Sequence, residues 1–439
     1  MASEIFRALL TDLEVGEMLG DAEFAGSMVE VERALAVVQG RLGVINAEAA
    51  AEIEHKLASF TPDLADLTCG TAEAGVPVPA LVAQLRRCVG EPAASWLHWG
   101  ATSQDIVDTA LMLRLRDVLA VLSARLRDLM DALAGMADQH RATVTMARTR
   151  FQQALPTSFG LKVAGWLAPL PRHRDRLEEL RPRLLMVQLG GAAGNLAALG
   201  TRGVEVMEAL ATELNLGCPP MPWHSQRDSI AELAGWLALV TGSLGKLGLD
   251  LLLLAQNEVG EVREAKGGGS STMPQKSNPV RCEALVTLAR RNAVQLAAMH
   301  EAMLHAHERD GSAWQSEWLS LPEMLCATGA ALAHALALAR TLVVDADRMA
   351  GTLAATRGVL LAEAASFALA EHMPRAEAQA LVKAACKEAL AQSRDLLDLL
   401  QESTAASLDW HELRRQANHP PCGTVFIDRV TRDARRARN

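Results

Sequence analysis

The sequence Gly-Gly-Gly-Ser-Ser-Thr-Met-Pro-Gln-Lys-Ser-Asn-Pro, residues 267–279, is the most informative stretch of this 439-residue chain. Its glycines and prolines make it unsuitable for the interior of a helix or strand, because glycine is conformationally free and proline lacks an amide hydrogen. Its backbone N–H groups, Ser270, Ser271, Lys276 and Asn278 can all contact an anion. A mobile loop that brings such groups to a reactive hydroxyl is typical of a lid over an active site. The alternative is a flexible linker of the Gly/Ser type, but linkers rarely combine Met-Pro, one Lys and Asn-Pro.

The composition is that of an ordinary globular protein with 50% hydrophobic and 22% charged residues and a formal net charge of −9. The only locally basic segment, residues 432–438, is expected to be a solvated tail, so no nucleic-acid partner is predicted. The seven cysteines include no CxxC pair, which indicates reduced thiols in a cytoplasmic protein. Tyrosine is absent, so acid–base chemistry must use Ser, His, Lys or a carboxylate.

Apolar residues follow the helical period along most of the chain, and strand signals are scarce. Between Leu111 and Leu133 the apolar side chains recur at i, i+4, i+7, i+8 and i+11, while charged residues lie mainly on the other side. Similar patterns cover about 160–180, 228–262, 280–305 and 325–342. The sequence therefore predicts an all-α fold of long helices. Helices that are apolar around much of their circumference also predict an oligomer with a helical core.

No membrane span or secretion signal is expected. The most apolar region, Leu233 to Leu254, contains Lys246, Asp250 and four glycines, so it is predicted to be a helix or broken helix buried on all sides. The N-terminal residues lack the basic-then-apolar layout of a signal peptide. These features favour a cytoplasmic location.

Composition shifts and loops predict three domains. Residues 1–110 would form an N-terminal helical domain, residues 111–345 a central long-helix bundle that includes the loop 266–279, and residues 346–439 a C-terminal helical domain.

A second polar segment, His98-Trp-Gly-Ala-Thr-Ser-Gln-Asp105, lies where a helix is predicted to start. Thr102 and Ser103 are either an ordinary helix N-cap or, with free N–H groups, a carboxylate-binding site. A metal site is not predicted, because His300, His305 and His307 do not share one helical face. The glycines near 190–203 lack a preceding strand, so no dinucleotide cofactor is expected either.

The run from Gly269 to Pro279 resembles the hallmark of the fumarase/aspartase superfamily, Gly-Ser-Ser-x-Met-Pro-x-Lys-x-Asn-Pro, at every fixed position. The resemblance implies that Ser270 is the catalytic base and that Lys276 and Asn278 hold a substrate carboxylate. It implies a three-domain fold whose long-helix bundle forms the core of a homotetramer, with each active site built by three subunits. It implies no cofactor.

Within that superfamily, His98–Asp105 is similar to the adenylosuccinate lyase and carboxymuconate branches, which makes His98 a catalytic or substrate-contacting residue. Arg148-Thr-Arg-Phe-Gln-Gln-Ala-Leu-Pro156 resembles Arg-Thr-His-x-Gln-x-Ala-x-Pro, but Arg150 replaces the histidine, so it can bind a carboxylate and cannot be an acid. Gln152 in the same motif is expected to contact substrate.

The segments Trp223–Asp228, with His224, and Glu308–Trp318 resemble those of bacterial 3-carboxy-cis,cis-muconate cycloisomerases. That resemblance implies lactonisation of a polycarboxylate through an enolate-type intermediate, with His224 near the substrate. The alternatives are a cycloisomerase of a sulfo- or otherwise substituted muconate, an adenylosuccinate lyase-like elimination enzyme, and a non-enzymatic structural relative. Whether His98 or His224 assists Ser270 stays open.

Overall fold

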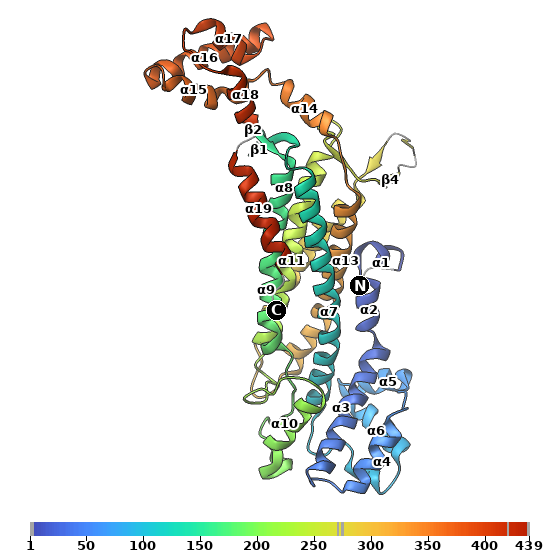
Figure 1. Ribbon diagram of the computed structural model, residues 1–439. Helices are drawn as coiled ribbons and strands as arrows, with labels where there is room; N and C mark the ends of the chain where they lie inside the picture. Colours follow the sequence, from blue (N-terminus) through green and yellow to red (C-terminus); the bar gives the residue numbers. More distant parts are fainter. Residues whose placement is uncertain (1–3, 270–271, 274–275, 419–420, 437–439) are drawn as a thin grey trace. The chain divides into compact units, whose positions relative to one another are not determined.

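The computed structural model describes residues 4–269, 272–273, 276–418 and 421–436, and the chain divides into two compact units. The first unit consists of residues 1–125, 173–242 and 287–333, and the second of residues 126–172, 243–286 and 334–439. The three longest helices contribute residues to both units: α7 (Ser103–Gln139), α11 (Asp228–Leu254) and α13 (Gly311–Thr341) (Figure 1). The predicted all-α fold class is confirmed. The predicted three-domain boundaries stay a prediction.

The first unit contains a cluster of shorter helices around α3 (Asp21–Arg41). Helix α3 packs against α4 (Ala47–Leu57), α5 (Leu64–Ala74) and α10 (Gly203–Glu213), and α6 (Val78–Val89) packs against α4 and α5. The starts of these helices follow from their caps, since Asn46 accepts from an N–H of α4 and Asp63 from two N–H groups of α5. The other short elements are α1 (Glu4–Leu10), α2 (Leu13–Met18), η1 (Ala93–Trp96) and η2 (Ala197–Arg202).

Long helices form the rest of the first unit: parts of α7, α11 and α13, with most of α9 (Leu170–Leu184) and of α12 (Val280–Glu301). Polar contacts tie them in pairs, as Trp236 of α11 donates to the His173 carbonyl of α9, and Asn292 of α12 donates to Thr328 of α13. The apolar face predicted from Leu111 onward is buried, including Leu115, Val118, Leu119 and Leu122, each 0% exposed.

The second unit contains the hairpin of β1 (Val144–Thr149) and β2 (Gln152–Ser158), which the scarce strand signals did not predict. Helix α8 (Phe159–Leu167) follows it and packs against α19 (Pro421–Arg435), while α14 (Ala346–Ala354) packs against β1. A separate apolar cluster holds together η3 (Val359–Leu361), α15 (Ala362–Ala370), α16 (Arg375–Gln392), α17 (Leu396–Ser403) and α18 (Trp410–Asn418). Two short ladders complete the unit, β3 (Val262–Arg263) with β6 (Val343–Val344) and β4 (Gly268–Gly269) with β5 (Ser277–Asn278).

Helix α11 runs unbroken through its four interior glycines. A Cβ on Gly248 would lie 2.8 Å from the Leu285 Cβ and 2.9 Å from the Cys282 carbonyl oxygen, so glycine permits the close approach of α11 to α12. The expectation that this region is buried on all sides is wrong for the single chain. By length and composition α11 and α13 are each apolar enough to cross a membrane, and 50% and 61% of their most apolar windows are buried within the protein.

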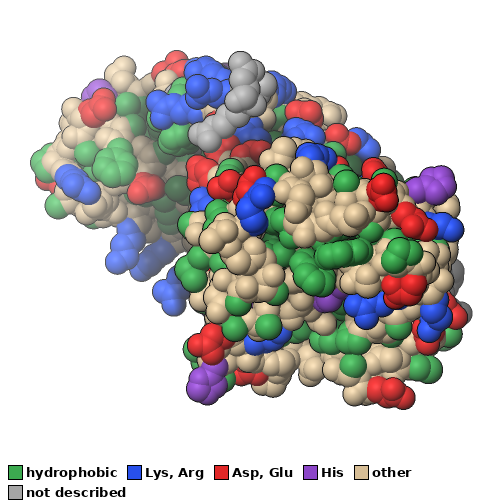
Figure 2. Space-filling model, turned by 90° about the horizontal axis from the view of Figure 1, so that it is seen from below, with side chains coloured by type: hydrophobic (Ala, Val, Ile, Leu, Met, Phe, Trp, Pro, Cys, Tyr) green, Lys and Arg blue, Asp and Glu red, His purple; other side chains and the backbone are tan. Residues whose placement is uncertain are grey.

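Apolar side chains also reach the surface elsewhere. Figure 2 shows hydrophobic side chains among interspersed acidic and basic ones on the face seen from below. Leu304 and Leu319, each 75% exposed, are the most exposed leucines among the described residues. Such surfaces accord with the expectation of an oligomer, which stays a prediction.

Candidate active site

The turn before α7 is fixed from one side by two side chains of α3. The Glu32 Oε1 atom lies 2.6 Å from Nδ1 of His98, and Gln39 donates from Nε2 to the Trp99 carbonyl at 2.7 Å. Glu32 and Gln39 are buried, at 1% and 0% exposed. His98 has a positive φ of 60°, a conformation that costs a non-glycine residue energy and that the surrounding contacts must maintain. The position of the imidazole is therefore set by the fold.

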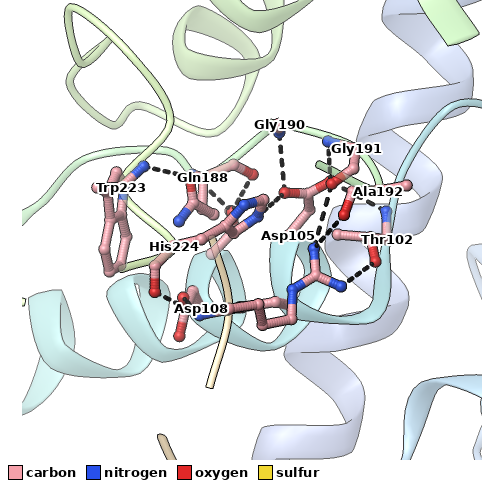
Figure 3. Close-up of polar contacts among 12 residues, drawn as sticks. Thr102, Asp105, Asp108, Gln188, Gly190, Gly191, Ala192, Trp223 and His224 are labelled. Carbon is pink, nitrogen blue, oxygen red and sulfur yellow. Dashed lines mark hydrogen bonds and ion pairs between the residues drawn. The ribbon is translucent and has the colours of Figure 1, made fainter. Parts of the chain in front are cut away.

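Asp105, three residues into α7, joins this turn to two distant segments (Figure 3). Its Oδ1 accepts the N–H of Gly190 at 2.9 Å and lies 2.7 Å from Nε2 of His224. Its Oδ2 accepts the N–H groups of Gly191 at 2.9 Å and of Thr102 at 3.0 Å. The carboxylate is 1% exposed, so four donors replace the water that it loses. The backbone N–H of Thr102 is thus capped by Asp105, in the manner of a capping box.

Gly190 is needed for this junction. A Cβ at that position would lie 2.7 Å from Cε1 of His224 and 2.7 Å from Cβ of Pro222. The imidazole of His224 consequently lies directly against the backbone of the 190–194 segment. His224 is 3% exposed, and any contact with a ligand would use Nδ1, since Nε2 is bonded to Asp105.

Arg309 covers the hydroxyl of Thr102. It donates from Nη1 to Thr102 Oγ1 at 2.9 Å and from Nη2 to the carbonyls of Gly191 and Ala192 at 3.2 Å each. The prediction that Thr102 is part of a helix cap therefore holds for its backbone N–H, which Asp105 accepts. Its hydroxyl instead accepts a hydrogen bond from the Arg309 guanidinium. The Arg309 guanidinium therefore lies beside the N-terminus of α7, which starts at Ser103. A positive charge next to the N-terminus of a helix favours the binding of anions.

A buried ion-pair network joins the first turns of α7 to the segments that contain Arg227 and Glu317. Arg227 is 2% exposed, and its guanidinium donates to both carboxylate oxygens of Asp108, at 2.7 and 3.1 Å. It also donates from Nε to Glu317 at 2.8 Å, and Trp314 donates to Asp108 at 3.1 Å. The two carboxylates hold the pKa of Arg227 above its usual value despite burial, so its charge is permanent.

The network gives a role to Arg227 and Glu317, to which sequence similarity assigned none. Arg227 belongs to Trp223–Asp228, and Glu317 belongs to Glu308–Trp318. The two segments are joined to each other and to Asp108 through the side chain of Arg227. Asp105, Asp108 and Arg309 were not predicted as site residues. In the sequence, a buried aspartate or arginine cannot be distinguished from a helix cap or from a charged residue on the surface.

The pKa of His98 is raised above its usual 6.5. Burial of the ring disfavours the charged form, but the charge and hydrogen bond of Glu32 outweigh it; Asp105 adds to this effect and Arg86 opposes it. His98 therefore holds its proton to higher pH than a free histidine does.

The remaining predicted residues belong to the second unit. Ser270 lies outside the described residues. Lys276 is exposed, and its backbone N–H donates to the Met273 carbonyl at 3.0 Å. Asn278 lies in β5, opposite Gly268, so the ends of the Gly/Pro-rich run form a short ladder that was not predicted.

Glu264 fixes the base of that loop. Its Oε1 accepts the N–H groups of Arg281 at 3.0 Å and Cys282 at 3.2 Å, the first turn of α12. The carboxylate is 6% exposed and caps the positive end of the helix dipole. The two ends of the loop are therefore held together by one side chain.

Arg150 and Gln152 lie at the tip of the β1–β2 hairpin, where both are exposed. Arg150 and Phe151 form the two-residue connection, with φ values of 50° and 64°. Two residues earlier, Arg148 forms a bidentate pair with buried Glu261, at 2.7 and 3.0 Å. The arginines of this motif thus differ in role: Arg148 anchors the hairpin and Arg150 is presented at its tip.

This chain is similar to known proteins over nearly its whole length. The model of a lyase family, described as "Lyase", matches residues 14–293. A 3-carboxy-cis,cis-muconate cycloisomerase of Pseudomonas aeruginosa is 43% identical over 94% of this chain and 92% of its own. The crystal structure of the 3-carboxy-cis,cis-muconate lactonizing enzyme from Pseudomonas putida superposes with a TM-score of 0.92 at 40% identity, covering 98% of this chain and 99% of the other. Trans-aconitate decarboxylase 1 of Mycosarcoma maydis is 38% identical over 95% of this chain and 86% of its own.

Proposed function

Because the chain belongs to this lyase family, the fumarase/aspartase superfamily, we propose that it is a cycloisomerase that converts 3-carboxy-cis,cis-muconate to carboxymuconolactone. The observation that supports this most is the near full-length identity to cycloisomerases, together with an arginine where a leaving-group acid is expected. The enzyme would act in aromatic catabolism in the cytoplasm.

The proposed reaction is an intramolecular addition in which substrate and product are isomers. One carboxylate oxygen of the muconate attacks an alkene carbon, and the electron pair of the double bond moves toward the carbon beside another carboxylate. The species formed is an enolate-like dianion, which takes a proton at that carbon. Stabilising the extra negative charge is the main catalytic demand, and fixed donors meet it best.

Ser270 would deliver that proton and remove it in the reverse direction. Lys276 and Asn278 would donate to the carboxylate that becomes the enolate. Thr102, Ser103 and His98 would bind another carboxylate, since they lie at the start of α7 beside the Arg309 guanidinium. His224 would contact substrate through Nδ1.

Arg150 and Gln152 would complete the site. The attacking carboxylate needs no base and leaves as a carboxylate in the reverse reaction, so the chemistry requires no acid at residue 150. A guanidinium there can bind the third carboxylate bidentately. We propose that the enzyme is a homotetramer in which His98, Arg150 and Ser270 come from three subunits. The exposure of Arg150 and Phe151 at a hairpin tip supports this arrangement.

The test is the ultraviolet absorbance of 3-carboxy-cis,cis-muconate mixed with the purified protein. Loss of the conjugated-diene band by the wild type, and its retention with a folded Ser270→Ala variant, is the expected result. Turnover by Ser270→Ala close to the wild-type rate would refute the role of that serine.

A second arm of the same experiment separates the competing activities. Carbon dioxide released from trans-aconitate would instead favour a decarboxylase, to which the chain is 38% identical. Fumarate released from adenylosuccinate would favour an eliminating lyase. Turnover of a sulfo- or otherwise substituted muconate alone would change the substituent assigned here and keep the reaction.

A further inference from the structure

We propose that Glu32 is the positioning residue for His98: its buried carboxylate accepts the Nδ1 proton and leaves Nε2–H as the donor to a substrate carboxylate. The inference rests on the proposed function, in which His98 faces a polycarboxylate. It assigns a role to a residue of α3 that no motif of the chain identified.

The geometry supports this first. A carboxylate can only accept a hydrogen bond, so the proton of the 2.6 Å contact belongs to Nδ1 of His98. Nδ1 is thereby occupied, and Nε2 is the nitrogen left for a ligand. Among the described residues no partner is recorded for Nε2, and the His98 side chain keeps 19% of its surface exposed.

The burial of Glu32 adds a second argument. Its side chain is 0% exposed, and Oε2 has no hydrogen-bond partner among the described residues. A carboxylate that has lost water at one oxygen and has only a histidine at the other is stabilised by positive charge on that histidine. An arrangement with a neutral ring would leave the buried charge uncompensated.

The backbone provides the third argument. His98 is held at φ 60°, and Gly100 follows at φ 74°. Gln39, seven residues after Glu32 and on the same side of α3, binds the carbonyl of Trp99 at 2.7 Å. Two side chains of one helix therefore fix two successive residues of the turn, as expected where a ring must be oriented.

The charged groups facing the ring agree in sign with this assignment. Glu32 from α3 and Asp105 from α7 favour the imidazolium, and Arg86 from α6 opposes it. A protonated Nε2 donates a charge-assisted bond to a carboxylate, about twice as strong as a neutral one.

The first experiment compares the pH profiles of kcat/KM for the wild type and Glu32→Gln. Glutamine retains an oxygen for Nδ1–H and removes the charge. We expect the fall of kcat/KM at high pH to move to lower pH in the variant, with about a 10-fold loss near pH 7.5, the effect of replacing a charge-assisted bond by a neutral one. Most of the loss should appear in KM, because His98 binds a carboxylate.

Two controls make the result specific. Glu30→Gln changes the neighbouring glutamate of α3, for which no bond is recorded among the described residues, and should leave the profile unchanged. In a His98→Gln background, Glu32→Gln should have no further effect on kcat/KM, because Glu32 acts through the ring. A full additional loss in that background, or a profile whose activity rises through the same pH range, would overturn the proposal.

A measurement without substrate separates this inference from the proposed function. The folded-state pKa of His98 is raised, so the pair stabilises the fold fully below pH 6.5 and the stabilisation is lost as pH rises through the folded pKa. The wild type should therefore lose more stability than Glu32→Gln between pH 6 and pH 9. Identical losses would refute the charged pair even if muconate is turned over, and a difference would support it even if muconate is inert.

Discussion

Replacing Asp105 by asparagine tests the junction on which the proposed carboxylate site depends. The side chain keeps its shape, but one of its two oxygens becomes an NH2 group that cannot accept a hydrogen bond. In the wild type four donors converge on the carboxylate, two on each oxygen. The substitution therefore changes hydrogen bonding and charge without creating a cavity.

The magnitude follows from the arrangement that the amide would adopt. Its oxygen can serve Gly191 and Thr102, and its NH2 group then faces Gly190 and His224. The imidazole can change tautomer and accept from the NH2 group, but the Gly190 N–H cannot, so it is left buried without an acceptor. Leaving one donor unpaired costs about 1–3 kcal/mol, and the other three bonds each weaken by about 1 kcal/mol on losing the charge. A neutral amide is cheaper to bury, so we expect the free energy of unfolding to fall by about 3–5 kcal/mol.

The assay is urea unfolding of both proteins at one protein concentration, because assembly of subunits would make stability concentration-dependent. The matched control is Asp131→Asn, which changes an exposed aspartate of the same helix and should alter stability by less than about 0.5 kcal/mol. The folded fraction of Asp105→Asn should also show a higher KM, since Thr102 loses part of its support. A variant as stable as the control would contradict the role of Asp105 as the junction of three segments.

Two further predictions concern buried charge. Arg227→Met should lower the free energy of unfolding by about 3–5 kcal/mol, because two buried carboxylates lose their counter-charge. Arg183→Met, which breaks a solvent-exposed pair, should leave the free energy of unfolding nearly unchanged, and equal effects of the two variants in urea unfolding would refute the buried network. Burial, with the nearby Arg227 guanidinium, lowers the pKa of His305, so its neutral form stabilises the fold above pH 6.5 and this stabilisation is lost as pH falls. His305→Leu should accordingly lose less stability than the wild type between pH 7 and pH 5. If the urea midpoints of the two proteins fall equally over that range, His305 is not the source of the acid destabilisation.

Local patterns in the sequence were sufficient to predict where several of the long helices lie, although the run predicted at 160–180 is two helices, α8 and α9, and the run predicted at 228–262 ends at Leu254. The apolar period from Leu111 marks a face that is buried along α7, and the polar turn before Ser103 marks where that helix starts. These predictions depend on contacts between residues a few positions apart, which a single sequence displays directly. The unbroken course of α11 through Gly248 was not predictable in this way. A glycine is needed there because α12 packs closely against α11, and that contact is not visible in the local sequence.

The partners of the site residues required the tertiary structure. Glu32 and His98 are 66 positions apart, and Asp105 and His224 are 119 apart. One weak signal did exist, since Glu32 interrupts the apolar face formed by Met28, Val31 and Leu35. A charged residue on a core-facing side of a helix needs a buried partner. The sequence shows that a partner is required and does not show which one.

The β1–β2 hairpin, which carries Arg150 of the proposed site, shows best why sequence signals can fail. A two-residue connection with both φ values positive normally uses Asn-Gly or a similar pair, and here it consists of Arg150 and Phe151. Each non-glycine residue in the left-handed region costs roughly 1–2 kcal/mol, so local energetics oppose this turn. It persists because β1 and β2 pair with each other up to the turn, where Thr149 lies opposite Gln152, and because Arg148 is bound to buried Glu261. A turn that stability alone would give to glycine, but that instead presents an exposed arginine, is consistent with the binding role proposed for Arg150.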